Sequence, residues 1–417
     1  MSAQQVARAL AEVDGLDAYV TSFTYRADGL LSHMLSRFGP LQGVHAQMKR
    51  RWISEVPSEL VRSYPLWEMA RMAVLKLGAS PVTVDRVWDV AMHRFDEMVA
   101  RRYVPETDAV HAYEYSALAT FERAKKEGKA RVLHLASLDS RAFEEIAARE
   151  KRSWPELETA DTGYFADKFE RRYERRRREI DLADIIVCNS SLTARSHIAA
   201  GADRAKVKVV PLAAPPPIAR IAPRVTDKGA PLKFIYAGPF SLRKGAHYVL
   251  EAWRLLAAGK AASLDVYGQV SVPDRLSATA PDTIRFHGSV TREVLFAAFE
   301  NADALVFPTL SDGFGMVVTE AFSHALPVIT TQYAGAADLV TRENGLIVPA
   351  ADAGALADAM RWCLDNRDML ATMRAPALET ARQRQWSHFR RDLIAMLDTE
   401  LRRVGYHPRY LTAERPF

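Results

Sequence analysis

Short apolar runs alternate with amphipathic stretches along the second half of the chain. The strands that these runs predict are Leu232–Ala237, Ala304–Phe307 and Pro327–Thr330, with further strands around Leu264, Ile284 and Leu346. The stretches between them, such as Ala246–Ala258, have the spacing of amphipathic helices. Strands separated by helical patterns are typical of βαβ units, so we expect a parallel α/β sheet.

The first half of the chain has a weaker pattern of the same kind. Its predicted strands are Ala18–Phe23, Asp108–Tyr113, Arg131–Ala136 and Asp184–Cys188. A long helical region, Trp67–Arg102, lies between the first two, and a further helix is predicted over Tyr164–Leu182. Strands and helices alternate here too, which favours a second α/β layer.

Proline and alanine mark a junction between the two halves. A strand at Val207–Pro211 runs into Leu212–Pro223, a stretch too rich in proline to form a helix or a central strand. A chain of 417 residues is also long enough for two domains. We therefore predict one domain at residues 1–215, a second at 216–385 and a terminal amphipathic helix at Trp386–Val404.

One segment carries most of the chemistry, the run SDGFGMVVTEAFSHALPVIT at Ser311–Thr330. Asp312 precedes the turn Gly313-Phe314-Gly315, and Glu320 follows on the next helix. Glycines let a backbone approach a ligand closely, and the amides that begin a helix attract an anion such as a diphosphate. The competing interpretation is an ordinary βαβ unit whose helix happens to contain a glutamate, which leaves the two carboxylates unexplained.

This run resembles the signature of the retaining glycosyltransferases of family 4, which use nucleotide sugars. The resemblance continues in order through Ile235–Trp253, Ser263–Val270, Asp282–Val290 and Glu300–Thr309. It implies the GT-B fold, in which two Rossmann-like domains face a cleft and a C-terminal helix, here within residues 386–417, crosses back to the first domain. It also implies transfer of a hexose from a nucleotide-diphosphate sugar (UDP-, GDP- or ADP-linked) to an acceptor such as a glycan or lipid-linked glycan.

The resemblance assigns roles to individual residues. Glu320 would bind the ribose and Asp312 the sugar hydroxyls, while Lys244 and the amides of Gly315, Met316 and Val317 would stabilise the leaving diphosphate. His111, which ends an apolar strand, would contact the sugar or the acceptor, and the competing interpretation is a buried histidine satisfied by the backbone. From its place at the end of the next strand His134 is interpreted as structural, and His324, near a helix end, as a cap contact.

The chain departs from the family at two loops. Pro239 stands after Gly238, where the family has a phosphate-binding arginine, and Arg243 is the candidate replacement. The glycine-rich first turn of the family is also missing, because Thr21-Ser22-Phe23-Thr24 follows the first strand. Two alternatives therefore stay open: a GT-B enzyme that acts on a nucleotide sugar without an acceptor, and a degenerate transferase that serves as a binding or scaffold subunit.

Composition and charge indicate which cofactors, location and partners to expect. The chain shows no metal-binding motif, and its two cysteines, Cys188 and Cys363, fall in predicted core elements, so we expect no metal and no other cofactor. No stretch approaches the ~20 apolar residues of a membrane span, and no secretory signal is visible, so we expect a cytoplasmic protein. The net charge is +5, and the basic cluster Arg171–Arg178 is interpreted as a solvated helix face, or else as a patch for peripheral contact with the membrane. Binding to nucleic acid is not expected, because no recognition motif accompanies the cluster.

Overall fold

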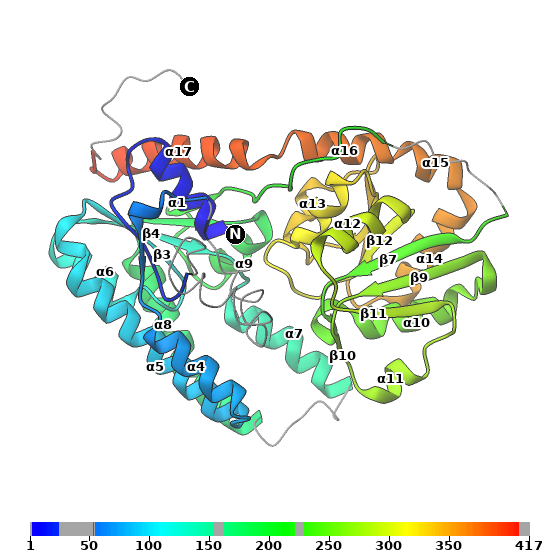
Figure 1. Cartoon of the computed structure of the whole chain (residues 1–417), viewed down its shortest axis with the longest axis horizontal. Coiled ribbons are helices and arrows are strands. Elements are labelled where there is room, and N and C mark those ends of the chain that lie inside the picture. The colour runs from blue at the N-terminus through cyan, green and yellow to red at the C-terminus, as the bar shows by residue number, and fades with distance from the viewer. Residues whose placement is uncertain (1, 25–52, 54, 154–161, 222–228, 408–417) are drawn as a thin grey trace, which may run out of the picture. The chain divides into compact units, whose positions relative to one another are not determined.

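The computed structural model describes residues 2–24, 53, 55–153, 162–221 and 229–407. By their internal contacts the residues group in two units, whose elements are labelled in Figure 1. The first unit contains Met1–His134, Ala160–Ile186 and Arg390–Phe417, and the second contains Leu135–Thr159 and Val187–Phe389. The predicted domain boundaries at residues 215 and 385 differ from this grouping and stay a prediction.

The described elements of the first half alternate as expected. In chain order they are α1 (Ser2–Glu12), β1 (Tyr19–Thr21), β2 (Val61–Ser63), α4 (Leu66–Lys76), α5 (Pro81–Arg102), β3 (Ala109–Tyr113), α6 (Leu118–Lys126), β4 (Ala130–Leu135), α7 (Ser140–Ser153), α8 (Thr162–Leu182), β5 (Ile185–Cys188), α9 (Ser191–Ala199) and β6 (Val207–Val209). The strands β3, β4, β5 and β6 form one sheet in that order, and β1 pairs with β2 in a separate parallel ladder.

The long helical region predicted at Trp67–Arg102 is two helices. The chain leaves α4 before Gly78, whose φ of 71° lies in the left-handed region that glycine tolerates best. Pro81 then occupies the first turn of α5, and the Ser80 hydroxyl caps this helix by accepting the amide of Thr83 at 3.3 Å. A left-handed glycine followed by a capped proline therefore divides the region.

The second half contains the larger sheet. Its elements are β7 (Leu232–Ala237), β8 (Phe240–Ser241), the 3-10 turn η5 (Leu242–Lys244), α10 (Ala246–Leu256), β9 (Ala262–Tyr267), β10 (Val270–Ser271), α11 (Asp274–Ala278), β11 (Ile284–Gly288), α12 (Arg292–Asn301), β12 (Ala304–Phe307), α13 (Met316–Ser323), β13 (Val328–Thr331), η7 (Gly335–Leu339), β14 (Gly345–Val348), α14 (Ala353–Asp365), α15 (Arg367–Thr372), α16 (Arg374–Arg382) and α17 (Trp386–Arg403).

The six strands predicted in this half form one parallel sheet with the order β11-β9-β7-β12-β13-β14. Side chains alternate between its faces, as the strand period of two requires. Phe234 and Tyr236 of β7 pack in the core that α10 and α14 cover, and Ile235 packs in the core that α12, α13 and α16 cover. Because β7 and β12 lie at the centre of the sheet, β12 is buried along its whole length and β7 at every residue except Lys233.

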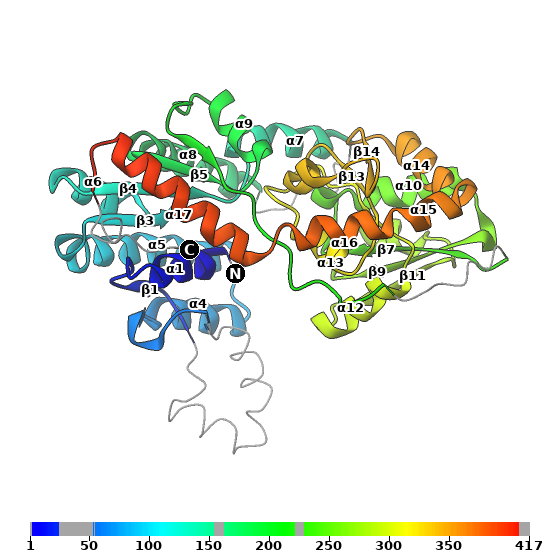
Figure 2. The ribbon, with the colours of Figure 1, turned by 90° about the horizontal axis from the view of Figure 1, so that it is seen from above.

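The last long helix belongs to the first unit from Arg390 onward. Its Arg390 guanidinium donates to Glu12 at 2.7 Å and to Gln5 at 2.8 Å, both on α1. Figure 2 shows α17 alongside α1 in this unit. This part of α17 therefore contacts α1, whereas the predicted crossover of residues 386–417 to a first domain stays a prediction, and residues 408–417 lie outside the described part of the chain.

Candidate functional site

The glycine turn after β12 depends on close backbone contacts. A Cβ atom at position 313 would lie 2.0 Å from the carbonyl oxygen of Ala136, so only glycine fits there without movement. Gly315 has a φ of 83° and immediately precedes α13. The two glycines thus allow the turn to reach the start of the helix, whose first amides have no acceptor within the helix.

A second helix start holds this turn in place. The Ser190 hydroxyl, which precedes α9, donates to the Gly313 carbonyl at 2.6 Å, and Thr193 donates to the same oxygen at 3.2 Å. Ser190 also accepts the Thr193 amide at 3.1 Å, so its hydroxyl caps the start of α9. Sequence analysis missed the contact with Gly313, because the two residues lie more than a hundred positions apart.

Lys244 lies beside the turn and forms an ion pair with Asp312. Its Nζ donates to Asp312 Oδ2, and only 8% of the Lys244 side chain is exposed. Burial lowers the pKa of Lys244 from its ordinary value, and the charge of Asp312 opposes that shift. Gly245, with φ at 75°, permits this packing, since a Cβ there would lie 2.0 Å from the Pro308 carbonyl. Lys244 is therefore a buried, ion-paired lysine and not a solvated loop residue.

Glu320 also has a cationic partner. Its Oε1 accepts from Arg292 of α12 at 2.9 Å, and its side chain is mostly buried. Glu320 lies on the second turn of α13, and His324 at the end of that helix donates its Nδ1–H to the Glu320 carbonyl at 2.9 Å. The predicted cap contact of His324 is therefore confirmed, and both predicted site carboxylates are paired with cations.

Arg243 and Gly238 complete the predicted set in the second unit. The Arg243 guanidinium donates to the Ser311 carbonyl at 3.1 Å and lies exposed beside the turn. Gly238 has a φ of 125° and donates its amide to Tyr267 at 2.9 Å, which continues the β7–β9 ladder. Arg243 thus lies close to the turn. Its predicted role as a substitute for the family's arginine, whose position is occupied here by Pro239, stays a prediction.

His111 lies in the first unit, in the middle of β3 and not at the strand end predicted for it. Its Nδ1 is 3.3 Å from Nε2 of His134 on β4. Burial lowers the pKa of His111 to about 4, and burial together with His111 lowers that of His134 to about 3. The two imidazoles are therefore neutral at neutral pH. His111 also lines a cavity of about 650 Å³ with Tyr113, Tyr19 and Arg62.

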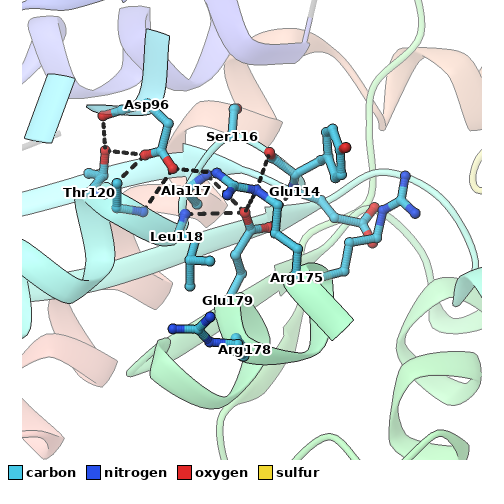
Figure 3. A network of polar contacts seen from close by, with 12 residues as sticks. Asp96, Glu114, Ser116, Ala117, Leu118, Thr120, Arg175, Arg178 and Glu179 are labelled. Carbon is cyan, nitrogen blue, oxygen red and sulfur yellow. Dashed lines mark hydrogen bonds and ion pairs between the residues drawn. The ribbon is translucent and has the colours of Figure 1, made fainter. Parts of the chain in front are cut away.

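The basic cluster on α8 is mostly engaged in internal ion pairs. Arg172 donates to Asp85 at 2.8 Å, and Arg175 lies 2.5 Å from Asp96, a fully buried carboxylate of α5. Figure 3 shows Arg175 between Asp96 and Glu179, which accepts the Tyr115 and Ala117 amides beside the start of α6. The prediction of a solvated face was therefore wrong for Arg172 and Arg175, whose side chains are 16% and 15% exposed.

Burial lowers the pKa values of the two histidines but raises those of a carboxyl and a thiol elsewhere in the protein. It raises the pKa of Glu179 to about 7, although the amide hydrogen bonds to this carboxyl act in the opposite direction. Cys188 and Cys363 are buried free thiols, and burial raises the pKa of Cys363 to about 12. Within the described ranges, no group of three or more His, Cys, Asp or Glu is placed to hold a metal ion. Among these same residues, no helix is both long and apolar enough to cross a membrane.

Comparisons with known proteins match the part of the chain that contains these residues. Residues 231–366 match the family described as glycosyl transferases group 1. The chain is 29% identical over 241 residues to a glycogen synthase of Mycobacterium tuberculosis, covering 55% of this chain and 54% of the relative. It is 31% identical over 130 residues to the lipopolysaccharide core biosynthesis mannosyltransferase LpsB of Rhizobium meliloti, covering 30% and 36% of the two chains. The chain thus spans about half the length of the first relative, and less of the second.

The fold has counterparts among solved structures. The Anabaena protein Alr3699/HepE, solved in complex with UDP and glucose, superposes with a TM-score of 0.60 at 16% sequence identity. The match covers 96% of both chains. This likeness, with the parallel sheets described above, confirms the predicted α/β fold of the GT-B type. The matched family domain contains Lys244, Asp312 and Glu320.

Proposed function

We propose that the protein is a retaining glycosyltransferase that moves a hexose from a nucleotide-diphosphate sugar to a glycan or lipid-linked glycan. The observation that supports this most strongly is the contact of buried Lys244 with Asp312 beside the turn that begins α13. A cation, a carboxylate and a helix start at one place are the groups that a sugar diphosphate requires.

In this proposal each group serves one part of the donor. Lys244 and the amides of Met316 and Val317 bind the diphosphate and stabilise the charge that grows on it as the glycosidic bond breaks. Asp312 accepts hydroxyl groups of the hexose, and Glu320 accepts the ribose hydroxyls. Arg243 supplies a further cation at the turn. No metal ion is assigned to the reaction.

The resting site is neutralised by its own pairs. Lys244 is paired with Asp312, and Glu320 with Arg292, so a donor has to replace at least one of these contacts. We expect the diphosphate to take Lys244 from Asp312, which leaves the carboxylate available for the sugar. The ribose would similarly take Glu320 from Arg292.

The acceptor is assigned to the first unit. The cavity that His111 lines contains tyrosines, two arginines and apolar side chains, a mixture suited to a sugar attached to an apolar carrier. A neutral His111 can accept or donate one hydrogen bond to a hydroxyl group. A lipid-linked acceptor would also require peripheral contact with the cytoplasmic face of a membrane.

Binding of nucleotides to the full chain tests the donor assignment. UDP is the first probe, because the similar Anabaena protein was solved with UDP, and GDP and ADP are the comparison ligands. A ligand at a hundredfold excess over its dissociation constant stabilises a protein by ~2.7 kcal/mol, which a thermal-shift assay detects. Failure of all three nucleotides to bind would remove the basis of the proposal.

Turnover separates the proposal from its two alternatives. Incubation of the preferred UDP-, GDP- or ADP-hexose with glycan and lipid-linked acceptors should yield a product with the donor's anomeric configuration, measured by NMR. Breakdown of the donor without an acceptor would identify an enzyme that acts on the nucleotide sugar alone. Donor binding without any turnover across the acceptor panel would identify a binding subunit.

A further inference from the structure

Helix α4 presents its apolar side chains to solvent. Leu66 is 72% exposed, Met69 55% and Leu77, which follows the helix, 85%. These residues, with exposed Ala73, are spaced three or four positions apart, so they form one stripe along the helix. We call these four residues, Leu66, Met69, Ala73 and Leu77, the α4 stripe.

Two charged residues of α4, Glu68 and Arg71, lie on its other side. Glu68 and Arg71 form an ion pair at 2.7 Å, with side chains only 13% and 24% exposed. The helix packs against α5, and none of its residues is buried. An amphipathic surface helix normally faces its apolar residues toward the core. In α4 the stripe faces solvent instead, and Leu75, which is 55% exposed, adds an exposed apolar side chain elsewhere on the helix. We therefore infer that the α4 stripe serves a contact outside this unit.

The charges around the stripe favour an anionic partner. From Val61 to Ser80 the sequence contains three cations, Arg62, Arg71 and Lys76, and a single acid, Glu68. The acid is already paired with Arg71, whereas the side chains of Arg62 and Lys76 are exposed near the two ends of the stripe. Trp67, which is partly exposed, adds an aromatic ring of the kind that lies at membrane–water interfaces.

The size of the stripe argues against a second copy of the chain. Twelve residues of helix span about 18 Å, and a helix is about 10 Å wide, so the footprint is about 200 Å². A stable dimer buries ~800 Å² on each partner. A membrane surface sets no such requirement of shape, because side chains insert individually among the lipids.

We propose that α4 docks on an anionic membrane surface, with the stripe inserted among the lipid chains and Arg62 and Lys76 at the phosphate groups. This inference rests on the proposed lipid-linked acceptor, and it places the membrane contact on α4. The α8 cluster is excluded from that role where its arginines are held by Asp85 and Asp96.

The test compares two triple variants of the full chain in vesicle co-sedimentation. Leu66→Ser, Met69→Ser and Leu77→Ser together should lower the partition coefficient on phosphatidylglycerol-rich vesicles by about tenfold or more. The matched control removes three apolar side chains of the second unit that are each about half exposed, Leu255→Ser, Val294→Ser and Met369→Ser. The control should bind vesicles like the wild type. Equal binding by both variants would overturn the proposal.

A single thiol reports where the helix lies. Because Cys188 and Cys363 are buried, Leu77→Cys introduces the one thiol that reagents reach readily among the described residues. A polarity-sensitive dye attached there should shift to the blue with phosphatidylglycerol vesicles, less with phosphatidylcholine, and less again in high salt. A thiol that reacts slowly without lipid would mean that protein covers the stripe, and light scattering would then distinguish a second copy from the chain itself; either result overturns the proposal.

Donor binding provides an independent reading. UDP affinity should be the same for the Ser triple variant and the wild type, because the stripe lies outside the unit that contains Lys244 and Asp312. Loss of vesicle binding with UDP binding retained supports docking through α4. Vesicle binding without UDP binding would leave the docking surface intact and refute only the donor assignment.

Discussion

Replacing Asp312 with asparagine should tighten the binding of UDP. The Lys244 ammonium is almost fully buried, and it is paired with the Asp312 carboxylate. In the wild type the diphosphate has to separate this pair. In Asp312→Asn the cation is without its counter-ion before the ligand arrives, and no carboxylate repels the phosphates.

The size of the effect follows from the geometry of the pair. A hydrogen bond to a charged group contributes ~1.5–3 kcal/mol, and the 24% exposure of the Asp312 side chain reduces this to about 1–2 kcal/mol. Asparagine keeps the oxygen that accepts the Phe314 amide at 3.2 Å, so the turn should persist. If the diphosphate gives Lys244 a charged hydrogen-bond partner in place of the lost Asp312 carboxylate, the dissociation constant of UDP should fall about five- to thirty-fold.

Two measurements on the full chain check this reasoning. Calorimetric titration gives the UDP affinity, and urea denaturation without ligand should show Asp312→Asn destabilised by about 1–2 kcal/mol. Glu320→Gln is the matched control, because this carboxylate is assigned to the ribose and its loss should weaken UDP binding. An unchanged or higher dissociation constant for Asp312→Asn would mean that Lys244 does not meet the phosphates.

Three further predictions concern the supports of the site and of the first unit. Gly313→Ala places a methyl group 2.0 Å from the Ala136 carbonyl, so urea denaturation should show a loss of ~1–3 kcal/mol; an unchanged stability would contradict that close contact. Ser190→Ala removes the cap of α9 and the bond to the Gly313 carbonyl, which should reduce stability by ~1–2 kcal/mol, and a loss of the same size with UDP bound would show that the contact is only structural. Folded Glu179 keeps its proton up to about pH 7, while the unfolded carboxyl loses it near 4.5, so the stability from that proton is complete below pH 4.5 and is lost as the pH rises to 7. The unfolding free energy of the wild type minus that of Glu179→Gln should therefore fall by ~3 kcal/mol across this window, and a flat difference would show that the amide bonds keep Glu179 charged.

The central strands of the second half were the most predictable, because β12 and β13 are buried on both faces and β7 is buried at every residue but one. Leu232–Ala237 and Ala304–Phe307 are continuous apolar runs, and the structure places strands at those same residues. The turn between β12 and α13 was also predictable, since Gly313 and Gly315 bracket a phenylalanine that enters the core. These elements are specified by residues close to one another in the sequence.

What could not be predicted depends on partners distant in the sequence. The α8 arginines are charged like any solvated cluster, and their acids lie on α5, roughly eighty positions earlier. Similarly, the sequence around Ser190 indicates a helix cap but gives no sign that the hydroxyl reaches Gly313. The exposure of the α4 stripe could not be predicted either, because the spacing of its apolar residues is the same whether the stripe faces the core or the solvent.

The hydrogen bonds from the start of α9 to the glycine turn limit which fragments and chimeras of this protein can keep the turn intact. A fragment that starts after the proline-rich stretch would contain the matched family domain but lack Ser190, Thr193 and Ala136. Its glycine turn would then be exposed where two hydroxyl groups and a backbone segment now support it. A chimera that exchanges donor specificity should therefore carry residues 187–389 as one piece and keep the matching sequence around Ala136. The part of the protein that would select the sugar is thus formed by two separate segments of the chain.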